Sequence, residues 1–250
     1  MTAITTTAGA RELIGETGGG TTPSRGERIH NFVREHGFEN CLELGFAHGV
    51  GSVYIASALE ANGHGHLTSV DIPDALQRSP RASDLLEQAG LAHRVTLEIE
   101  PTSYTWYLRR VLREQLAEAT IEPLYDFVFL DGAHTWDVDG FAFLLVDKLL
   151  KPGGWILFDD LHWRLDAAQW PDVPAEQLAI EQVKEIWDVL VLTHPGYDEM
   201  RSDECWGWAH KATTATPQTR VVSEAAPLLV QLREVARFAR ERSPASMARR

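Results

Sequence analysis

The sequence has few cysteines and no long apolar run. Its two cysteines, Cys41 and Cys205, are far apart and fit neither a disulfide framework nor the spacing of a zinc site. No apolar run reaches the roughly 20 residues that a membrane-spanning helix needs. Residues 1–22 lack the basic start and the apolar centre of a signal peptide. We therefore expect a soluble cytoplasmic protein with no membrane partner.

Positive charge is also scarce. The chain has 23 lysines and arginines against 36 aspartates and glutamates, so its formal net charge is −13. Contacts with nucleic-acid phosphates or anionic membranes need an excess of basic residues, so this composition argues against such partners. With 250 residues, 44% of them hydrophobic, the chain is long enough for one large α/β domain.

Strand and helix patterns alternate through the chain. This alternation predicts a Rossmann-like, doubly wound α/β fold with a mostly parallel sheet of seven strands. The last two strands are joined by a short turn, so we expect the final strand to be antiparallel. The predicted strands are Cys41–Leu44, Leu67–Val70, Val95–Ile99, Tyr125–Leu130, Trp155–Phe158, Val189–Leu192 and Trp206–His210. The main predicted helices are Ser24–His36, Gly51–Ala61, Ser83–Ala89, Tyr104–Ala119, Val138–Leu150 and Ala175–Trp187.

The two ends of the chain differ from this central part. Residues 1–22 are rich in threonine, alanine and glycine, and we expect a disordered N-terminal tail. Residues 23–213 form the predicted domain. In residues 214–250 an apolar stripe predicts a helix over Ser223–Arg242, packed on the domain or on a partner chain. A homodimer is therefore a candidate assembly.

Aspartates follow two of the buried strands directly. Asp131 ends the strand of residues 125–130, and Asp159 and Asp160 end the strand of residues 155–158. Parallel strands of an open sheet end at one edge, where ligands bind, so we expect these three side chains to converge. Carboxylates that lie close together repel one another unless a cation sits between them. The sequence therefore predicts a site for magnesium or a similar divalent ion.

A glycine-rich turn follows the first predicted strand. Its sequence, E-L-G-F-A-H-G-V-G, begins at Glu43 and contains Gly45 and Gly49. Glycines allow a tight turn and a close approach of the backbone to a ligand. Their spacing differs from the G-x-G-x-x-G fingerprint of dinucleotide-binding proteins. Asp71 ends the second strand, where a carboxylate can accept both ribose hydroxyls.

In these motifs residues 38–210 resemble the class I S-adenosylmethionine-dependent methyltransferases. The resemblance implies that Glu43, Gly45 and Gly49 hold the methionine end of the cofactor, and that Asp71 binds its ribose. The turn K-P-G-G before the fifth strand is also typical of these enzymes. Many members have a glycine where this chain has Ala47. The full set of expected cofactor-binding residues is Glu43, Gly45, Ala47, His48, Gly49, Asp71, Ile72, Thr102, Ser103 and Asp131.

Within that class the acidic residues resemble those of metal-dependent small-molecule O-methyltransferases, of the catechol and macrolide-sugar types. The resemblance implies that Asp131, Asp159 and Asp160 bind the metal. Asp160 stands where the catechol type has asparagine, and an Asp-Asp pair is similar to the sugar-modifying branch. His134 occupies the position of the catechol type's basic lysine, and His162 is a second candidate base. We expect a metal-bound hydroxyl to lose its proton to one of these histidines and to attack the methyl group.

Other functions fit the same residues. The aspartates after the fifth strand can instead orient a substrate or cap a helix. The chain would then be a metal-independent N-, C- or carboxyl-methyltransferase with a histidine base. A non-methylating relative of the fold is a further alternative. Three tryptophans, Trp136, Trp163 and Trp170, are candidates for the wall of an apolar substrate pocket.

Overall fold

The computed structural model describes residues 2–15, 21–117 and 121–214. These residues form a sheet of seven strands in the order β3-β2-β1-β4-β5-β7-β6. The first five strands are parallel, and β7 runs antiparallel to both β5 and β6. The predicted fold class is therefore confirmed. The strands are β1 Asn40–Leu44, β2 His66–Asp71, β3 Val95–Ile99, β4 Tyr125–Leu130, β5 Leu150–Phe158, β6 Tyr197–Asp203 and β7 Trp206–Lys211.

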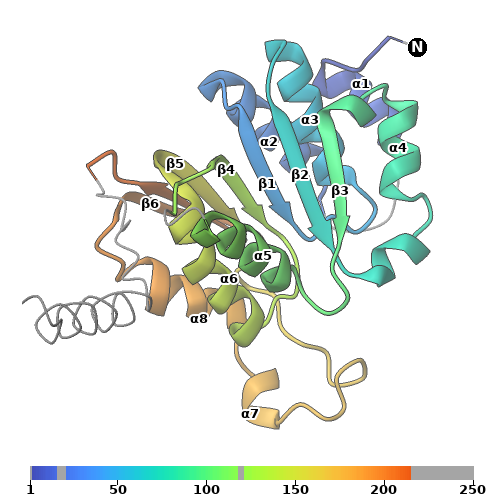
Figure 1. The fold of residues 1–250 in the computed structure, drawn as a ribbon. Coiled ribbons are helices and arrows are strands. Elements are labelled where there is room, and N and C mark those ends of the chain that lie inside the picture. The colour runs from blue at the N-terminus through green and yellow to red at the C-terminus, as the bar shows by residue number, and fades with distance from the viewer. Residues whose placement is uncertain (1, 16–20, 118–120, 215–250) are drawn as a thin grey trace, which may run out of the picture.

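Helices cover both faces of the sheet, because its central strands are apolar on both sides. On one face α2 and α3 bury a core with Phe127, Phe129 and Leu157. On the other face α5, α6 and α8 enclose a second core around Val128 and Ile156 (Figure 1). The α-helices are α1 Thr7–Ile14, α2 Pro23–His36, α3 Val50–Asn62, α4 Ala82–Gln88, α5 Tyr104–Ala117, α6 Trp136–Leu149, α7 Ala175–Leu178 and α8 Gln182–Ile186. Shorter turns are the 3-10 helices η1 Pro73–Gln77 and η2 Ala92–Arg94 and the π-helix η3 Trp187–Val191.

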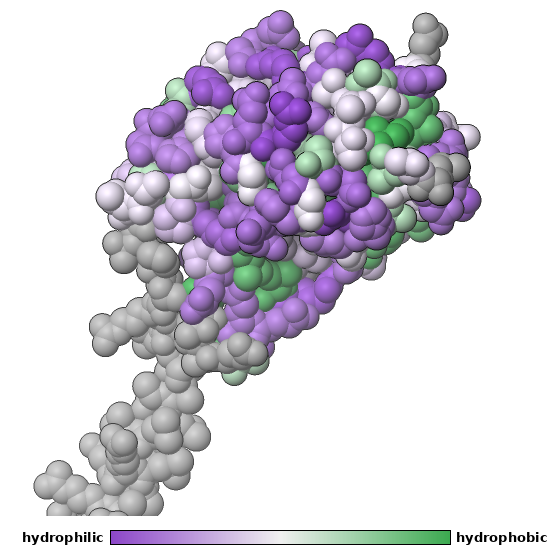
Figure 2. Space-filling model, turned by 90° about the horizontal axis from the view of Figure 1, so that it is seen from above, coloured by the Kyte–Doolittle hydropathy of each residue, from purple (hydrophilic) through white to green (hydrophobic). Residues whose placement is uncertain are grey.

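The carboxyl ends of the parallel strands form one edge of the molecule. In Figure 1 the strand arrowheads point toward this edge, and the segment that holds α7 projects beyond it. The opposite edge, seen from above in Figure 2, is covered mainly by hydrophilic residues. The glycine turn follows β1 and Asp131 follows β4, so the fold brings both predicted motifs to the carboxyl edge.

The N-terminal segment differs from its prediction. Within the range expected to be disordered, residues 7–14 form α1, which packs on α3. The Thr6 hydroxyl caps this helix by accepting a hydrogen bond from the Gly9 amide at 3.1 Å. Ala10 and Ile14 are buried against α3 and α4. These two apolar side chains anchor a segment whose composition alone indicated disorder.

The prediction of a sixth strand at Val189–Leu192 was also wrong. Residues 189–192 belong to the π-helical turn and its end, because the buried side chains of Ile186, Trp187 and Val191 continue the helical face of α8. The true β6 lies within the predicted turn. It is a polar edge strand with four exposed residues out of seven, so it has no apolar signal. The predicted helix 175–187 is interrupted after α7 and resumes at α8.

The predicted C-terminal helix, Ser223–Arg242, lies outside the described residues. In the described part of the chain, no helix has the length and apolar character needed to cross a membrane.

Candidate active site

The turn after β1 has backbone angles and close contacts that disfavour residues with a side chain. Gly45 has a φ of 96°, and a Cβ atom there would collide with the carbonyl oxygen of Asp131. Gly49 has a φ of 85° and lies directly on Ala82. Ala47 also has a positive φ, 44°, a backbone conformation that glycine adopts more easily than alanine. The turn therefore depends on these glycines.

Asp71 holds this turn in place. Its Oδ2 accepts hydrogen bonds from the amides of Phe46 and Ala47, both at 2.8 Å. Its Oδ1 accepts one from the amide of Ile72 at 2.7 Å. Three backbone donors thus fix the carboxylate at the end of β2 and orient it toward the turn.

Glu43 lies buried beneath the turn and is 1% exposed. Burial raises the pKa of Glu43 to about 8, although hydrogen bonds from the hydroxyls of Ser52 and Ser69 oppose this shift. Its carboxyl group borders a small cavity of about 20 Å³ that His48 also lines. The His48 ring in turn lies 3.1 Å from the carbonyl oxygen of Pro80. Both residues therefore support the turn from below.

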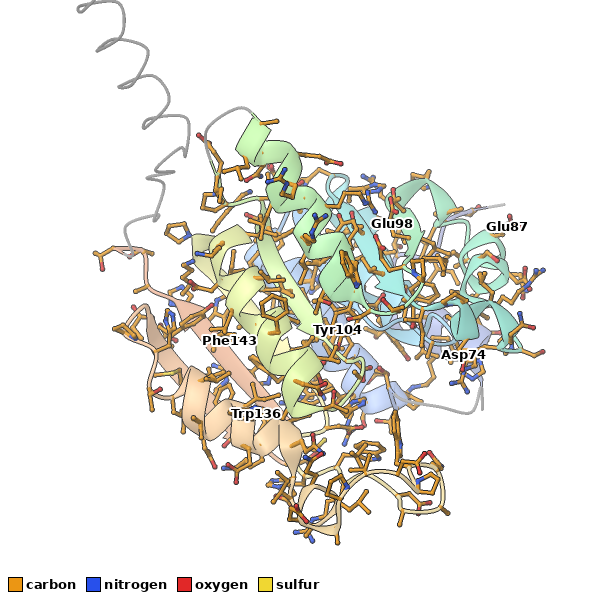
Figure 3. The ribbon with its side chains drawn as sticks, turned by 60° about the horizontal axis from the view of Figure 1, so that its bottom comes forward. Asp74, Glu87, Glu98, Tyr104, Trp136 and Phe143 are labelled. Carbon is orange, nitrogen blue, oxygen red and sulfur yellow. The ribbon has the colours of Figure 1, made fainter. Side chains whose placement is uncertain are left out.

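A large cavity of about 1040 Å³ opens beside the turn at the carboxyl edge. Of the expected cofactor-binding residues, six line it: Gly45, Ala47, Asp71, Ile72, Thr102 and Asp131. Ser103 does not line it, because its hydroxyl accepts a hydrogen bond from the Thr105 amide at the start of α5. Figure 3 shows Tyr104 at the start of α5, Trp136 at the start of α6 and Asp74 in η1 around this part of the molecule.

Asp131 and His134 lie together on the wall of this cavity. The His134 Nε2 atom is 3.5 Å from Asp131 Oδ1 and 3.5 Å from Asp160 Oδ2. Burial lowers the pKa of His134, but the neighbouring carboxylates outweigh this effect and raise it to about 9. His134 has a φ of 56°, a left-handed backbone that is costly for a side chain of this size. The turn thus holds the ring beside the carboxylates against local strain.

Sequence reasoning missed the support beneath this turn. The Tyr104 hydroxyl donates a hydrogen bond to the buried carboxylate of Asp139 and accepts one from the Ala133 amide at 3.0 Å. Burial raises the pKa of Asp139 to about 6. Gly132 packs directly on the Tyr104 ring, where a Cβ atom has no room. The position of a tyrosine at the start of the preceding helix was the one available sign of this role.

The second candidate base lies elsewhere. The His162 Nδ1 atom is 2.9 Å from Glu181 Oε2, and the His162 side chain is 52% exposed. His162 does not line the large cavity. All three tryptophans that we expected in the wall of the substrate pocket line the cavity. The centre of the Trp163 ring is 5.1 Å from that of the His134 ring.

Asp159 and Asp160 do not line the large cavity. Asp159 is 2% exposed, and its Oδ1 accepts hydrogen bonds from Trp206 Nε1 at 2.6 Å and from the Asp160 amide at 2.7 Å. Burial, together with the nearby carboxylates, raises the pKa of Asp159 to about 7. On the outer side of the pair lies Arg25, whose Nη1 is 3.6 Å from Asp159 Oδ1 and 3.8 Å from Asp160 Oδ1.

The predicted metal ligands do not fit a divalent ion in this arrangement. Among the described residues, the group whose ligand atoms lie within 4.8 Å of one another is Asp159, Asp160 and Cys205, and it does not include Asp131. One oxygen of Asp159 is committed to two hydrogen-bond donors, and the Arg25 guanidinium contacts the Cys205 sulfur. Magnesium favours oxygen ligands rather than a thiol. The metal site stays a prediction that the donor set does not support.

Comparison with known proteins follows this geometry. Residues 42–161 match the sequence model of a family described as "Methyltransferase domain". The matched stretch runs from β1 to just past Asp160, so it contains the glycine turn, Asp71, Asp131 and His134. The chain therefore contains a methyltransferase domain over these residues. No curated protein matches this sequence.

Solved methyltransferase structures share the fold of this domain. The O-methyltransferase TomG from Streptomyces achromogenes, involved in tomaymycin synthesis and solved with SAM, has a TM-score of 0.58 at 19% identity, over 82% of this chain and 87% of that chain. An O-methyltransferase from Bacillus cereus, solved with SAH, has a TM-score of 0.59 at 18% identity, over 82% of this chain and 90% of that chain. SAH-bound PaMTH1 from Podospora anserina has a TM-score of 0.56 at 15% identity, over 82% and 85% of the two chains.

Proposed function

We propose that this methyltransferase domain transfers the methyl group of S-adenosylmethionine to a hydroxyl of a small molecule. The observation that carries the proposal is the cavity of about 1040 Å³, which the glycine turn and the pair Asp131 and His134 line together. A cofactor held by the turn and an acceptor beside the histidine would occupy the same space. The O-methyltransferase structures of similar fold support the choice of a hydroxyl acceptor.

The residues at the turn fit the cofactor. Gly45 lines the cavity with its backbone and packs against the Asp131 carbonyl, where a side chain has no room. Asp71 would hold the ribose, with Ile72 and Thr102 lining the same part of the cavity. Bound S-adenosylmethionine supplies a methyl group that its sulfonium has already activated. The protein's task is then to align the acceptor and to remove its proton.

His134 is the proposed base. At neutral pH the pKa of about 9 means that its ring holds a proton between the carboxylates of Asp131 and Asp160. Loss of that proton converts the ring into an acceptor for the hydroxyl proton. The two carboxylates would then stabilise the imidazolium that forms. The proposed mechanism assigns no step to a metal ion, because the predicted ligands do not fit one.

The lining of the cavity indicates the class of acceptor. Trp136, Trp163 and Trp170 offer flat apolar surfaces. Besides Asp71, Asp131 and His134, the lining contains the acidic residues Asp74, Asp137 and Glu185 and one basic residue, Arg78. Such a wall favours a neutral or cationic acceptor with an apolar ring, because carboxylates and aromatic faces both attract positive charge. Anionic acceptors would be repelled.

Two measurements test the proposal together. Calorimetry with S-adenosylmethionine and S-adenosylhomocysteine measures cofactor binding, and labelled cofactor measures methyl transfer to a panel of phenols, catechols, sugars and amines. We expect the wild-type protein to bind both cofactors, and mass spectrometry of the product to place the methyl group on oxygen. We expect His134→Gln to keep cofactor binding and lose transfer. His162→Gln is the matched control and should keep both, because His162 pairs with Glu181 outside the cavity.

The proposal fails if the protein binds neither cofactor. Methyl transfer to nitrogen, carbon or a carboxylate would replace O-methylation by the alternative transferase that the same residues allow. Equal activity of wild type and His134→Gln would remove the histidine base.

A further inference from the structure

The end of β5 collects more negative charge than a buried site tolerates by itself. Asp159 is 2% exposed, Asp160 follows it directly in the chain, and His134 lies 3.5 Å from both Asp131 and Asp160. Buried carboxylates require a positive partner or strong hydrogen-bond donors. A relative with a metal at this edge would meet the requirement with the ion.

This chain supplies a cation of its own. Arg25 is the third residue of α2, after the N-cap residue Thr22 and the helical residues Pro23 and Ser24. Its side chain is 23% exposed, and Nη1 lies 3.6 Å from Asp159 Oδ1 and 3.8 Å from Asp160 Oδ1. The other terminal nitrogen, Nη2, contacts the sulfur of Cys205. The guanidinium thus lies among the three atoms that form the candidate metal group of the described residues.

The surroundings of Arg25 keep it there. Its guanidinium carbon is 5.9 Å from the centre of the Trp206 ring, a cation–π distance. The same indole donates to Asp159 Oδ1 at 2.6 Å. Arg28, one turn further along α2, pairs with Asp203 at 2.8 Å and lies 4.8 Å from the Trp206 ring centre. Two arginines of one helix therefore fasten α2 to the β6–β7 hairpin.

We propose that the Arg25 guanidinium is the permanent cation of the Asp159–Asp160 pair and takes the place that a divalent ion would have there. Methyl transfer then needs no added metal, and α2 is tied to the carboxyl edge of the sheet beside the active site. The statement about transfer rests on the proposed function, but the charge pairing does not. Its test therefore includes measurements that need no turnover.

The experiment compares the wild-type protein with Arg25→Gln, Arg25→Lys and the control Arg28→Gln. Arg28→Gln removes a cation from the same helix and the same tryptophan without exposing the aspartate pair. Magnesium chloride and manganese chloride are titrated calorimetrically into EDTA-treated protein, with and without S-adenosylhomocysteine. The thermal unfolding midpoint of each variant is then measured with EDTA and with magnesium.

For the wild type we expect no heat of magnesium binding and the same unfolding midpoint in EDTA and in magnesium. Arg25→Gln should lower the midpoint by several degrees, because it leaves the buried carboxylate of Asp159 without its cation. Magnesium should then raise the midpoint of Arg25→Gln toward that of the wild type. Arg25→Lys should recover part of the loss, and Arg28→Gln should not respond to magnesium.

Two results would overturn the inference. One is saturable magnesium binding by the wild type that Asp159→Asn abolishes and Arg25→Gln leaves unchanged. The other is wild-type methyl transfer that stops in EDTA and returns with magnesium. If the expected metal responses appear but no acceptor is methylated, the charge pairing stands and the proposed function falls.

Discussion

Tyr104 and Asp139 form a buried hydrogen bond beneath the turn that carries His134. Tyr104 begins α5 and Asp139 lies in the first turns of α6. The Ala133 amide donates to the same Tyr104 hydroxyl at 3.0 Å. One phenol thus joins two helices to the loop after β4, and the position of the His134 ring depends on it.

Replacing Tyr104 by phenylalanine should therefore affect both stability and turnover. The substitution leaves a buried carboxylate and a buried amide without this partner, at a cost of roughly 1–3 kcal/mol in the free energy of unfolding. We expect urea denaturation to show this loss and methyl transfer to fall because the loop loosens. Tyr107→Phe is the control, since the Tyr107 hydroxyl contacts only the Tyr125 hydroxyl, at 2.9 Å, among the hydrogen bonds of the described residues. Equal turnover of the two variants would contradict the positioning role of Tyr104.

Methyl transfer should depend on pH through His134. Because the folded pKa is about 9, the deprotonated ring is scarce at pH 7, and its fraction rises as pH rises. We expect kcat/KM to increase with pH and to level off above about pH 9. His134→Gln should have no such limb in its residual rate. A wild-type profile that is flat between pH 7 and pH 10 would exclude His134 as the base.

The raised pKa of His134 also makes the free energy of unfolding depend on pH. The folded pKa of His134 lies above 6.5, the usual value of a free histidine. Its pairing with the carboxylates therefore contributes stability that is fully present below about pH 6.5 and is lost as pH rises through about 9. The free energy of unfolding of the wild type minus that of His134→Gln, measured across this range, should decrease with pH. An increase with pH would mean that the ring is neutral in the folded protein.

Gly45→Ala should lower stability and cofactor affinity by more than the cost of a left-handed backbone at alanine. The control is Gly37→Ala at the end of α2, where φ is 62° and a Cβ atom meets nothing within 4 Å. Each substitution costs roughly 1–2 kcal/mol for the left-handed backbone. Gly45→Ala also forces the Asp131 carbonyl away, so we expect a larger loss of stability and weaker S-adenosylmethionine binding by calorimetry. Unchanged cofactor affinity in Gly45→Ala would remove the turn from the cofactor site.

Trp170→Ala should change acceptor binding without changing stability. Trp170 lines the large cavity and is 41% exposed. Trp106 is 52% exposed on α5 and does not line the cavity, so Trp106→Ala is the matched control. We expect KM for the acceptor to rise several-fold in Trp170→Ala only, with both unfolding midpoints near that of the wild type. An unchanged KM would separate this part of the loop from substrate recognition.

Much of the architecture could be predicted because it depends on local patterns. Asp131 was correctly placed at the carboxyl edge, because a residue that directly follows a buried parallel strand lies at the edge where that strand ends. The glycine turn was recognised from residues whose backbone only glycine adopts easily. In contrast, β6 has no apolar run, because it is an exposed edge strand stabilised by its ladder with β7.

The contacts of the site were harder to predict, because they join distant parts of the chain. A threonine and a proline before α2 signal where that helix begins. Nothing in those residues indicates that Arg25 turns toward an aspartate at the far end of β5. The Asp-Asp pattern predicts a demand for positive charge, and the tertiary fold decides whether a side chain meets it. That is why the convergence of acids was foreseen and the arginine was not.

The insertion of β7 between β5 and β6 has a consequence for the order in which the protein is made. Asp159 receives the indole of Trp206 only after nearly the whole described chain has left the ribosome. A chain that stops before β7 would lack both this hydrogen bond and the antiparallel strand that pairs with β5. The hydrogen bond that holds Asp159 at the active-site edge therefore depends on a strand that follows all five parallel strands in the chain.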